Sequence, residues 1–123
     1  MKKIFLDTNA LMAIEEFKLD IFLELFKCCN FPFKPVVLQG TLDELKKIGQ
    51  EQRGKYKQAA KLALGIVKAK KVQVLESKGD VDDVLVEKSE QGNLVLTQDI
   101  ILKRRLTKPY LTIRQKKKIV MVK

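Results

Sequence analysis

The stretch Lys2-Lys3-Ile4-Phe5-Leu6-Asp7-Thr8-Asn9 places a short apolar run directly before three polar residues. Residues 2–6 are predicted to form a buried first strand, because such a run ending at turn-forming residues is typical of one. The run reaches Asp7 too soon for a secretory signal peptide, which needs a longer apolar centre and a cleavage site. Asp7 is therefore expected at the carboxyl end of a buried strand.

Apolar runs and amphipathic segments then alternate along the chain. Expected strands cover residues 2–6, 36–38, 72–75, 93–97 and 110–113, and a last apolar segment covers 119–122. Expected helices begin near Ala10 and at Thr41, where Glu44 completes a capping-box pattern, and cover about 19–29, 54–70, 80–91 and 99–106. This alternation predicts an α/β fold, a three-layer α/β/α sandwich with a central parallel sheet of about five strands. The length of 123 residues fits one domain.

The overall charge indicates a polyanionic partner. Lys and Arg outnumber Asp and Glu by 25 to 15, which gives a formal net charge of +10. Nucleic acid is the leading candidate, and an anionic membrane surface is a weaker one. Charged residues break every apolar stretch before the roughly 20 residues that a membrane-spanning helix needs. The only cysteines, Cys28 and Cys29, are adjacent and suit free thiols in a reducing cytoplasm.

The chain contains no histidine. This excludes Ser-His-Asp and Cys-His nucleophilic catalysis, histidine general bases and histidine-ligated metals. Any acid, base or ligand must be a carboxylate, lysine, tyrosine or metal-bound water.

Four acidic residues lie where a predicted strand ends or a predicted helix begins: Asp7, Glu44, Asp82 and Asp99. The carboxyl ends of parallel strands share one edge of a sheet, and open α/β sheets bind ligands there. Carboxylates brought together repel one another, and a divalent cation removes that penalty. Oxygen ligands without histidine favour Mg²⁺ or a similar hard ion. The pattern therefore predicts metal-assisted chemistry on a polyanion.

Four short motifs, taken in order, resemble those of the PIN-domain ribonucleases. They are Asp7-Thr8-Asn9 after a strand, Glu44-Leu45 early in a helix, Asp82-Asp83-Val84-Leu85 at a helix start, and Thr97-Gln98-Asp99 after a strand. The resemblance runs nearly end to end. Within the family, the segments 99–106 and 114–118 look most like archaeal proteins related to a ribosomal-RNA-processing nuclease, and the VapC toxins are the neighbouring group.

The resemblance implies that residues 1–123 form a single PIN-like nuclease domain that hydrolyses RNA with Mg²⁺ or Mn²⁺. Asp7 and Asp99 would be direct metal ligands, Glu44 a ligand or water-orienting base, and Asp82 the carboxylate that holds metal-bound water, with the adjacent Asp83 as its alternative. Three polar residues could orient the ligands or contact phosphate: Thr8, Asn9 and Thr97. Implied partners are ribosomal or other RNA, an antitoxin or ribosome-assembly protein, and a second copy of the chain, but no membrane.

Basic clusters support RNA binding through the backbone. They comprise Lys103, Arg104 and Arg105; Lys116, Lys117 and Lys118; and Arg53 with Lys55, Lys57 and Lys61. Aromatic residues make up only 7% of the chain, and the tyrosines do not form a base-stacking pattern with the lysines. We expect contact with phosphates and recognition of RNA shape, with strong salt dependence.

Other interpretations stay open at this point. The acidic residues could simply cap helices, which would leave a catalytically silent RNA-binding module with the same fold. A phosphoacceptor signalling domain is disfavoured, because Glu76-Ser77 and Arg114 stand where the resemblance to such domains would require Asp and Lys. DNA would suit the same pocket chemistry as RNA.

Overall fold

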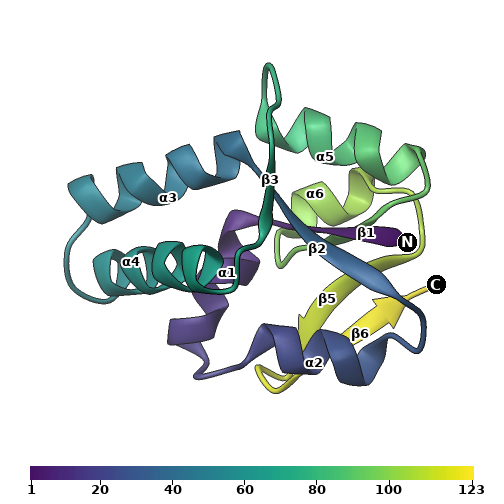
Figure 1. The fold of residues 1–123 in the computed structure, drawn as a ribbon, viewed down its shortest axis with the longest axis horizontal. Coiled ribbons are helices and arrows are strands. Elements are labelled where there is room, and N and C mark those ends of the chain that lie inside the picture. The colour runs from purple at the N-terminus through teal and green to yellow at the C-terminus, as the bar shows by residue number, and fades with distance from the viewer.

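Strand β1 (Lys2–Leu6) is an inner strand of a six-stranded sheet in the computed structural model, which describes residues 1–123. The other strands are β2 (Phe33–Leu38), β3 (Gln73–Leu75), β4 (Leu94–Leu96), β5 (Tyr110–Arg114) and β6 (Lys118–Val122). Their order is β3-β2-β1-β4-β5-β6 (Figure 1). Neighbours from β3 to β5 are parallel, whereas β6 is antiparallel to β5. The predicted parallel sheet is confirmed, and the apolar segment near the C-terminus adds a sixth, antiparallel strand.

Helices cover both faces of the sheet. Four of them, α1 (Thr8–Glu16), α2 (Ile21–Cys28), α3 (Gln39–Glu51) and α4 (Gly54–Ala69), contribute to the larger hydrophobic core. The other two, α5 (Val81–Glu90) and α6 (Ile100–Arg105), contribute to the smaller one. Successive strand residues point to opposite faces, so Ile4 and Leu6 join the larger core and Phe5 the smaller. The predicted three-layer architecture is confirmed.

The start of α3 differs from the sequence-based prediction. The helix begins at Gln39, directly after β2, and no side chain caps it. Thr41 therefore lies inside the first turn, fully buried, and its Oγ1 has no hydrogen-bond partner. The predicted N-cap at Thr41 and its capping box with Glu44 are wrong, because the strand runs straight into the helix and leaves no room for a separate cap.

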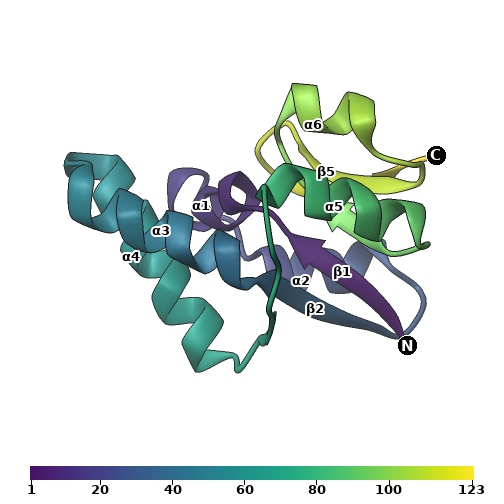
Figure 2. The same ribbon diagram turned by 90° about the horizontal axis from the view of Figure 1, so that it is seen from above.

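The carboxyl ends of the parallel strands define one edge of the sheet. Helices α1 and α3 leave directly from β1 and β2, and α6 follows β4 after a short loop. Helices α3 and α4 pack side by side and extend beyond this edge (Figures 1 and 2). The edge is thus bordered by helices that rise from different strands. None of the helices is long and apolar enough to cross a membrane.

Candidate active site

Asp7 stands at the junction of β1 and α1 and is only 5% exposed. Its Oδ1 accepts a hydrogen bond from the Thr8 backbone N–H at 2.8 Å, and its Oδ2 accepts one from the Thr97 hydroxyl at 2.7 Å. Burial raises the pKa of Asp7 from 3.8 to about 6 although both hydrogen bonds lower it, and the negative charges of Asp82 and Glu44 raise it further. The site therefore holds a carboxyl group that binds a proton unusually well.

Thr97 connects Asp7 to the loop after β4. Its hydroxyl also accepts a hydrogen bond from the Asp99 backbone N–H at 3.0 Å. The Asn9 side chain supports the same loop, because its Oδ1 accepts from the Gln98 N–H at 2.9 Å. Asp99 caps α6 by accepting bonds from two backbone N–H groups, and both bonds go to Oδ1. The cap thus fixes the orientation of the Asp99 carboxylate.

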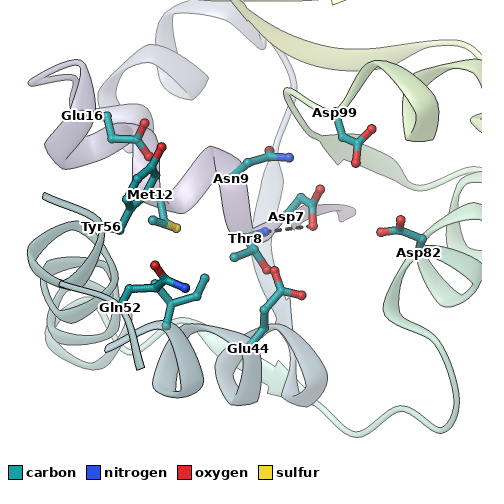
Figure 3. A pocket seen from close by; sticks show the side chains of 11 residues that line it. Asp7, Thr8, Asn9, Met12, Glu16, Glu44, Gln52, Tyr56, Asp82 and Asp99 are labelled. Carbon is teal, nitrogen blue, oxygen red and sulfur yellow. Dashed lines mark hydrogen bonds between the residues drawn. The ribbon is translucent and has the colours of Figure 1, made fainter. Parts of the chain in front are cut away.

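Glu44 and Asp82 reach the same place from α3 and α5. Figure 3 shows them pointing toward Asp7 from separate helices, with Asp99 on the far side. Burial raises the pKa of Asp82, the charges of Asp80, Asp99 and Glu44 act in the same direction, and Arg105 opposes them. Four acidic side chains from different parts of the chain therefore converge.

The neighbouring acids Asp80 and Asp83 have other roles. The Asp80 side chain caps α5 by accepting from the Asp83 N–H at 3.1 Å. The Asp83 side chain is exposed and forms an ion pair with Arg105 at 2.6 Å. Asp82 is the member of this acidic run that faces the other carboxylates.

The convergent acids line a cavity of about 550 Å³. The sequence-predicted residues that line it are Asp7, Thr8, Asn9, Glu44, Asp82 and Asp99. Thr97 is buried beside them, whereas Asp83 lies outside. Five further lining residues were missed by sequence reasoning: Met12, Glu16, Ile48, Gln52 and Tyr56. No local sequence pattern identified them.

Comparison with known proteins identifies the family. A family profile described as "PIN like domain" matches residues 4–116. The curated protein Ribonuclease VapC4 of Methanocaldococcus jannaschii is 31% identical over 123 residues, covering 95% of this chain and 94% of its own. The chain belongs to the PIN domain family. The resemblance noted from the four acidic motifs is confirmed.

Solved structures show the same relationship. The structure of the PIN domain endonuclease Utp24 matches with a TM-score of 0.78 and 28% identity, covering 97% of this chain and 90% of that one. The structure of VapBC-1 from nontypeable Haemophilus influenzae matches with a TM-score of 0.51 and 17% identity, covering 84% and 91% of the two chains. The second match supports the fold alone.

The predicted basic residues do not line the cavity of this PIN domain. Lys103 on α6 is partly buried, and burial together with the charge of Arg114 lowers its pKa. Arg105 is engaged by Asp83. Lys116 lies in the β5–β6 turn, and its Nζ is 5.5 Å from the centre of the Phe17 ring. Arg53, directly before α4, is exposed.

The cavity offers oxygen ligands that suit a hard divalent cation, but not a preformed cage. No group of three acidic side chains is close enough to hold an ion by itself. Mg²⁺ commonly binds through one or two carboxylates and keeps several of its waters, so an open arrangement fits it. Burial and the charges of Asp82 and Glu44 raise the pKa of Asp7, and the buried Oγ1 of Thr8 has no hydrogen-bond partner. A hydrated cation would supply the missing charge and hydrogen bonds.

Proposed function

We propose that residues 1–123 form a single nuclease domain that hydrolyses RNA phosphodiesters with Mg²⁺ or Mn²⁺. The observation that carries the proposal is the convergence of Asp7, Glu44, Asp82 and Asp99 in one cavity of a chain whose net charge is +10. The names of the relatives, Ribonuclease VapC4 and PIN domain endonuclease Utp24, support nuclease activity.

Helix capping does not account for the whole cluster. Asp7 and Asp99 do accept hydrogen bonds at the starts of α1 and α6. Glu44 and Asp82, in contrast, take no part in capping α3 or α5. Two carboxylates without a capping role thus face two that have one. This favours a catalytic pocket over the alternative of a silent RNA-binding module.

The cavity residues would have different roles in the reaction. Asp7 and Asp99 would hold the cation, and Thr97 keeps both in place through its hydroxyl. Asp82 would hold the attacking water in position, and Glu44 would orient it and accept its proton. When bound, the divalent ion would activate water and neutralise charge on the phosphodiester. The surrounding Lys and Arg residues would attract the RNA backbone.

Two cellular roles fit this chemistry: ribosomal-RNA processing with an assembly partner, or toxicity controlled by an antitoxin. We place the protein in the cytoplasm in either role, because Cys28 and Cys29 are free thiols. A neighbouring gene for a small antitoxin would favour the second role.

The first test compares two adjacent carboxylates. Asp82→Asn should abolish cleavage of a labelled structured RNA, because it removes a cavity carboxylate. Asp83→Asn makes the same charge change outside the cavity and should cleave like wild type. Removing one group that orients a catalytic water typically lowers the rate by about 10²-fold or more. Asp99→Asn should be inactive as well.

Each protein is assayed with Mn²⁺, Mg²⁺ or a chelator. Cleavage that requires the ion and is lost only in the cavity variants would support the proposal. Equal loss in Asp82→Asn and Asp83→Asn would contradict the assigned site. RNA binding without any cleavage would favour the silent module.

A further inference from the structure

The cavity extends well beyond the four carboxylates. Its other end is lined by Met12 and Glu16 of α1, Ile48 of α3, Gln52 between α3 and α4, and Tyr56 near the start of α4. Figure 3 shows Tyr56, Gln52 and Glu16 together, on the opposite side of Asp7 from Asp82. Met12 is 6% exposed, whereas Tyr56 is 59% exposed. This end therefore has an apolar floor, an accessible aromatic ring and two polar side chains, and a metal ion needs none of them.

A second cavity adjoins the first at Tyr56 and Glu16. Its volume is about 470 Å³, and Tyr56 and Glu16 line it as well as the first cavity. Three lysines line it too: Lys18, Lys55 and Lys116. Lys116 comes from the β5–β6 turn, where Gln115 and Lys116 both have positive φ. The turn thus brings the positive charge of Lys116 to a cavity whose other lining residues come from α1, α4 and the residues that follow α1.

The order of chemical groups across the two cavities is the order that a single strand requires at a cleavage site. The four carboxylates stand at one end and the Tyr56 ring lies in the middle. At the other end Lys18 is paired with Glu15, which leaves Lys55 and Lys116 as the lysines without an ion pair. Any of the four bases can stack on an aromatic side chain, so this contact does not depend on the RNA sequence. Lysines can bind the next phosphate.

We infer that Tyr56 is the stacking platform of a nucleobase subsite, which takes an unpaired base next to the phosphate that is hydrolysed at the carboxylates, while Lys55 and Lys116 bind the following phosphate. This inference rests on the proposed nuclease function and adds a base-binding position beside its cleavage site. The sequence alone indicated no base-stacking platform.

The Glu16 carboxylate at the subsite favours a base that carries an amino group. An ionised carboxylate such as that of Glu16 only accepts hydrogen bonds. The amino group of cytosine can donate to it, whereas uracil presents a carbonyl oxygen at the same position. Cytosine at this position should therefore be preferred over uracil, a base of the same size.

Stacking is tested directly with an RNA that carries 2-aminopurine at successive positions, bound in chelator so that no cleavage occurs. Wild type should quench the fluorescence at one position. Tyr56→Ala should abolish the quenching and weaken binding roughly five- to 100-fold. Tyr56→Phe keeps the ring and should retain both. Phe26→Ala removes an exposed aromatic ring of α2, outside both cavities, and should behave like wild type.

The same RNAs are then cleaved with Mn²⁺, which separates this inference from the nuclease proposal. Quenching that depends on Tyr56 without cleavage would support the subsite and overturn the nuclease. If Tyr56→Ala cleaves at the wild-type rate and quenching depends on Tyr56 at no position, the subsite is overturned and the nuclease proposal stands.

Base preference is tested with cytidine or uridine at the quenched position. Wild type should bind and cleave the cytidine RNA better, and Glu16→Gln, whose amide can also donate, should reduce the difference. An equal preference in wild type and Glu16→Gln would overturn the assignment of Glu16.

Discussion

Asp7 is a carboxylate in a place that favours its protonated form. Burial raises its pKa to about 6, above the ordinary value of 3.8, in spite of two hydrogen bonds. The folded state then binds a proton more tightly than the unfolded chain. Between these two pKa values the folded protein carries the extra proton, so its stability must fall as the pH rises. Above about pH 6 the whole loss of stability from ionising Asp7 is present unless a cation replaces the proton.

This effect predicts a difference between wild type and Asp7→Asn in chelator. The wild type should lose up to about 3 kcal/mol of unfolding free energy from Asp7 as the pH rises from about 4 to above 6, because a tenfold change in proton affinity corresponds to about 1.4 kcal/mol. Asp7→Asn lacks the titrating group and should lack this component. Urea unfolding of both proteins across this pH range measures the free energy of unfolding at each pH. If this free energy changes with pH in the same way in both proteins, Asp7 does not cause the loss of stability.

At the level of single residues, the sequence pointed to the acids and to the neighbouring Thr97, but not to the far end of the cavity. The position of Asp7 and Asp99 after apolar runs was enough to place them at one edge of the sheet. Asp82 and Asp83 could not be separated, because both lie in the first turn of a helix and only packing decides which one faces inward. Tyr56 was missed because its contact with the cavity depends on how α4 packs against α1 and α3, which no local pattern reports.

At the level of helices and strands, Gly40 marks a close approach between α3 and α5. A Cβ atom at Gly40 would lie 2.6 Å from Cγ2 of Val81, well inside contact distance. Valine is stiff at χ1 and cannot easily turn away. Since α3 carries Glu44 and α5 carries Asp82, this contact sets how the two acids face each other.

Gly40→Ala should therefore destabilise the protein by about 1–3 kcal/mol through overpacking. Alanine is the better helix former by about 1 kcal/mol, so the loss would have to come from the clash. Adding Val81→Ala should relieve the clash and recover part of the stability. Urea unfolding measures the stability of wild type, Gly40→Ala and the double variant.

Gly65→Ala in α4 is the matched control. No atom of a neighbouring residue lies within 4 Å of the place that the added methyl group would take, so only the helix preference acts there. The substitution should raise stability by up to about 1 kcal/mol. Stabilisation by Gly40→Ala of the same size would mean that α3 and α5 do not pack closely at this point.

The elements themselves were largely predictable, since periodicity located every strand and helix to within a few residues. The exception is the start of α3. Thr41 followed by Glu44 fits a capping box, but the pattern cannot reveal that β2 passes into the helix without a loop. Likewise, the last apolar segment could be recognised from its composition, but its antiparallel pairing with β5 depends on the tight turn at Gln115 and Lys116.

For the whole molecule, the net positive charge and the positions of the basic residues contribute separately to RNA binding. A net charge of +10 attracts RNA from any direction, yet the cavity itself is acidic. Basic residues near the carboxyl edge of the sheet must therefore guide the strand past the repelling carboxylates. Arg53 is next to Gln52, which lines the cavity, whereas Lys34 lies near the start of β2, at the opposite edge.

Arg53→Ala and Lys34→Ala lower the net charge equally, so they separate placement from total charge. If Arg53 binds a phosphate, its loss should weaken binding of single-stranded RNA and lower the slope of log K against log salt by about 0.7, the value for one released counterion. Lys34→Ala should leave the slope near that of wild type. Fluorescence anisotropy in chelator over a salt series measures both. Equal slopes in the two variants would mean that overall charge, rather than a defined path to the carboxylates, governs RNA binding.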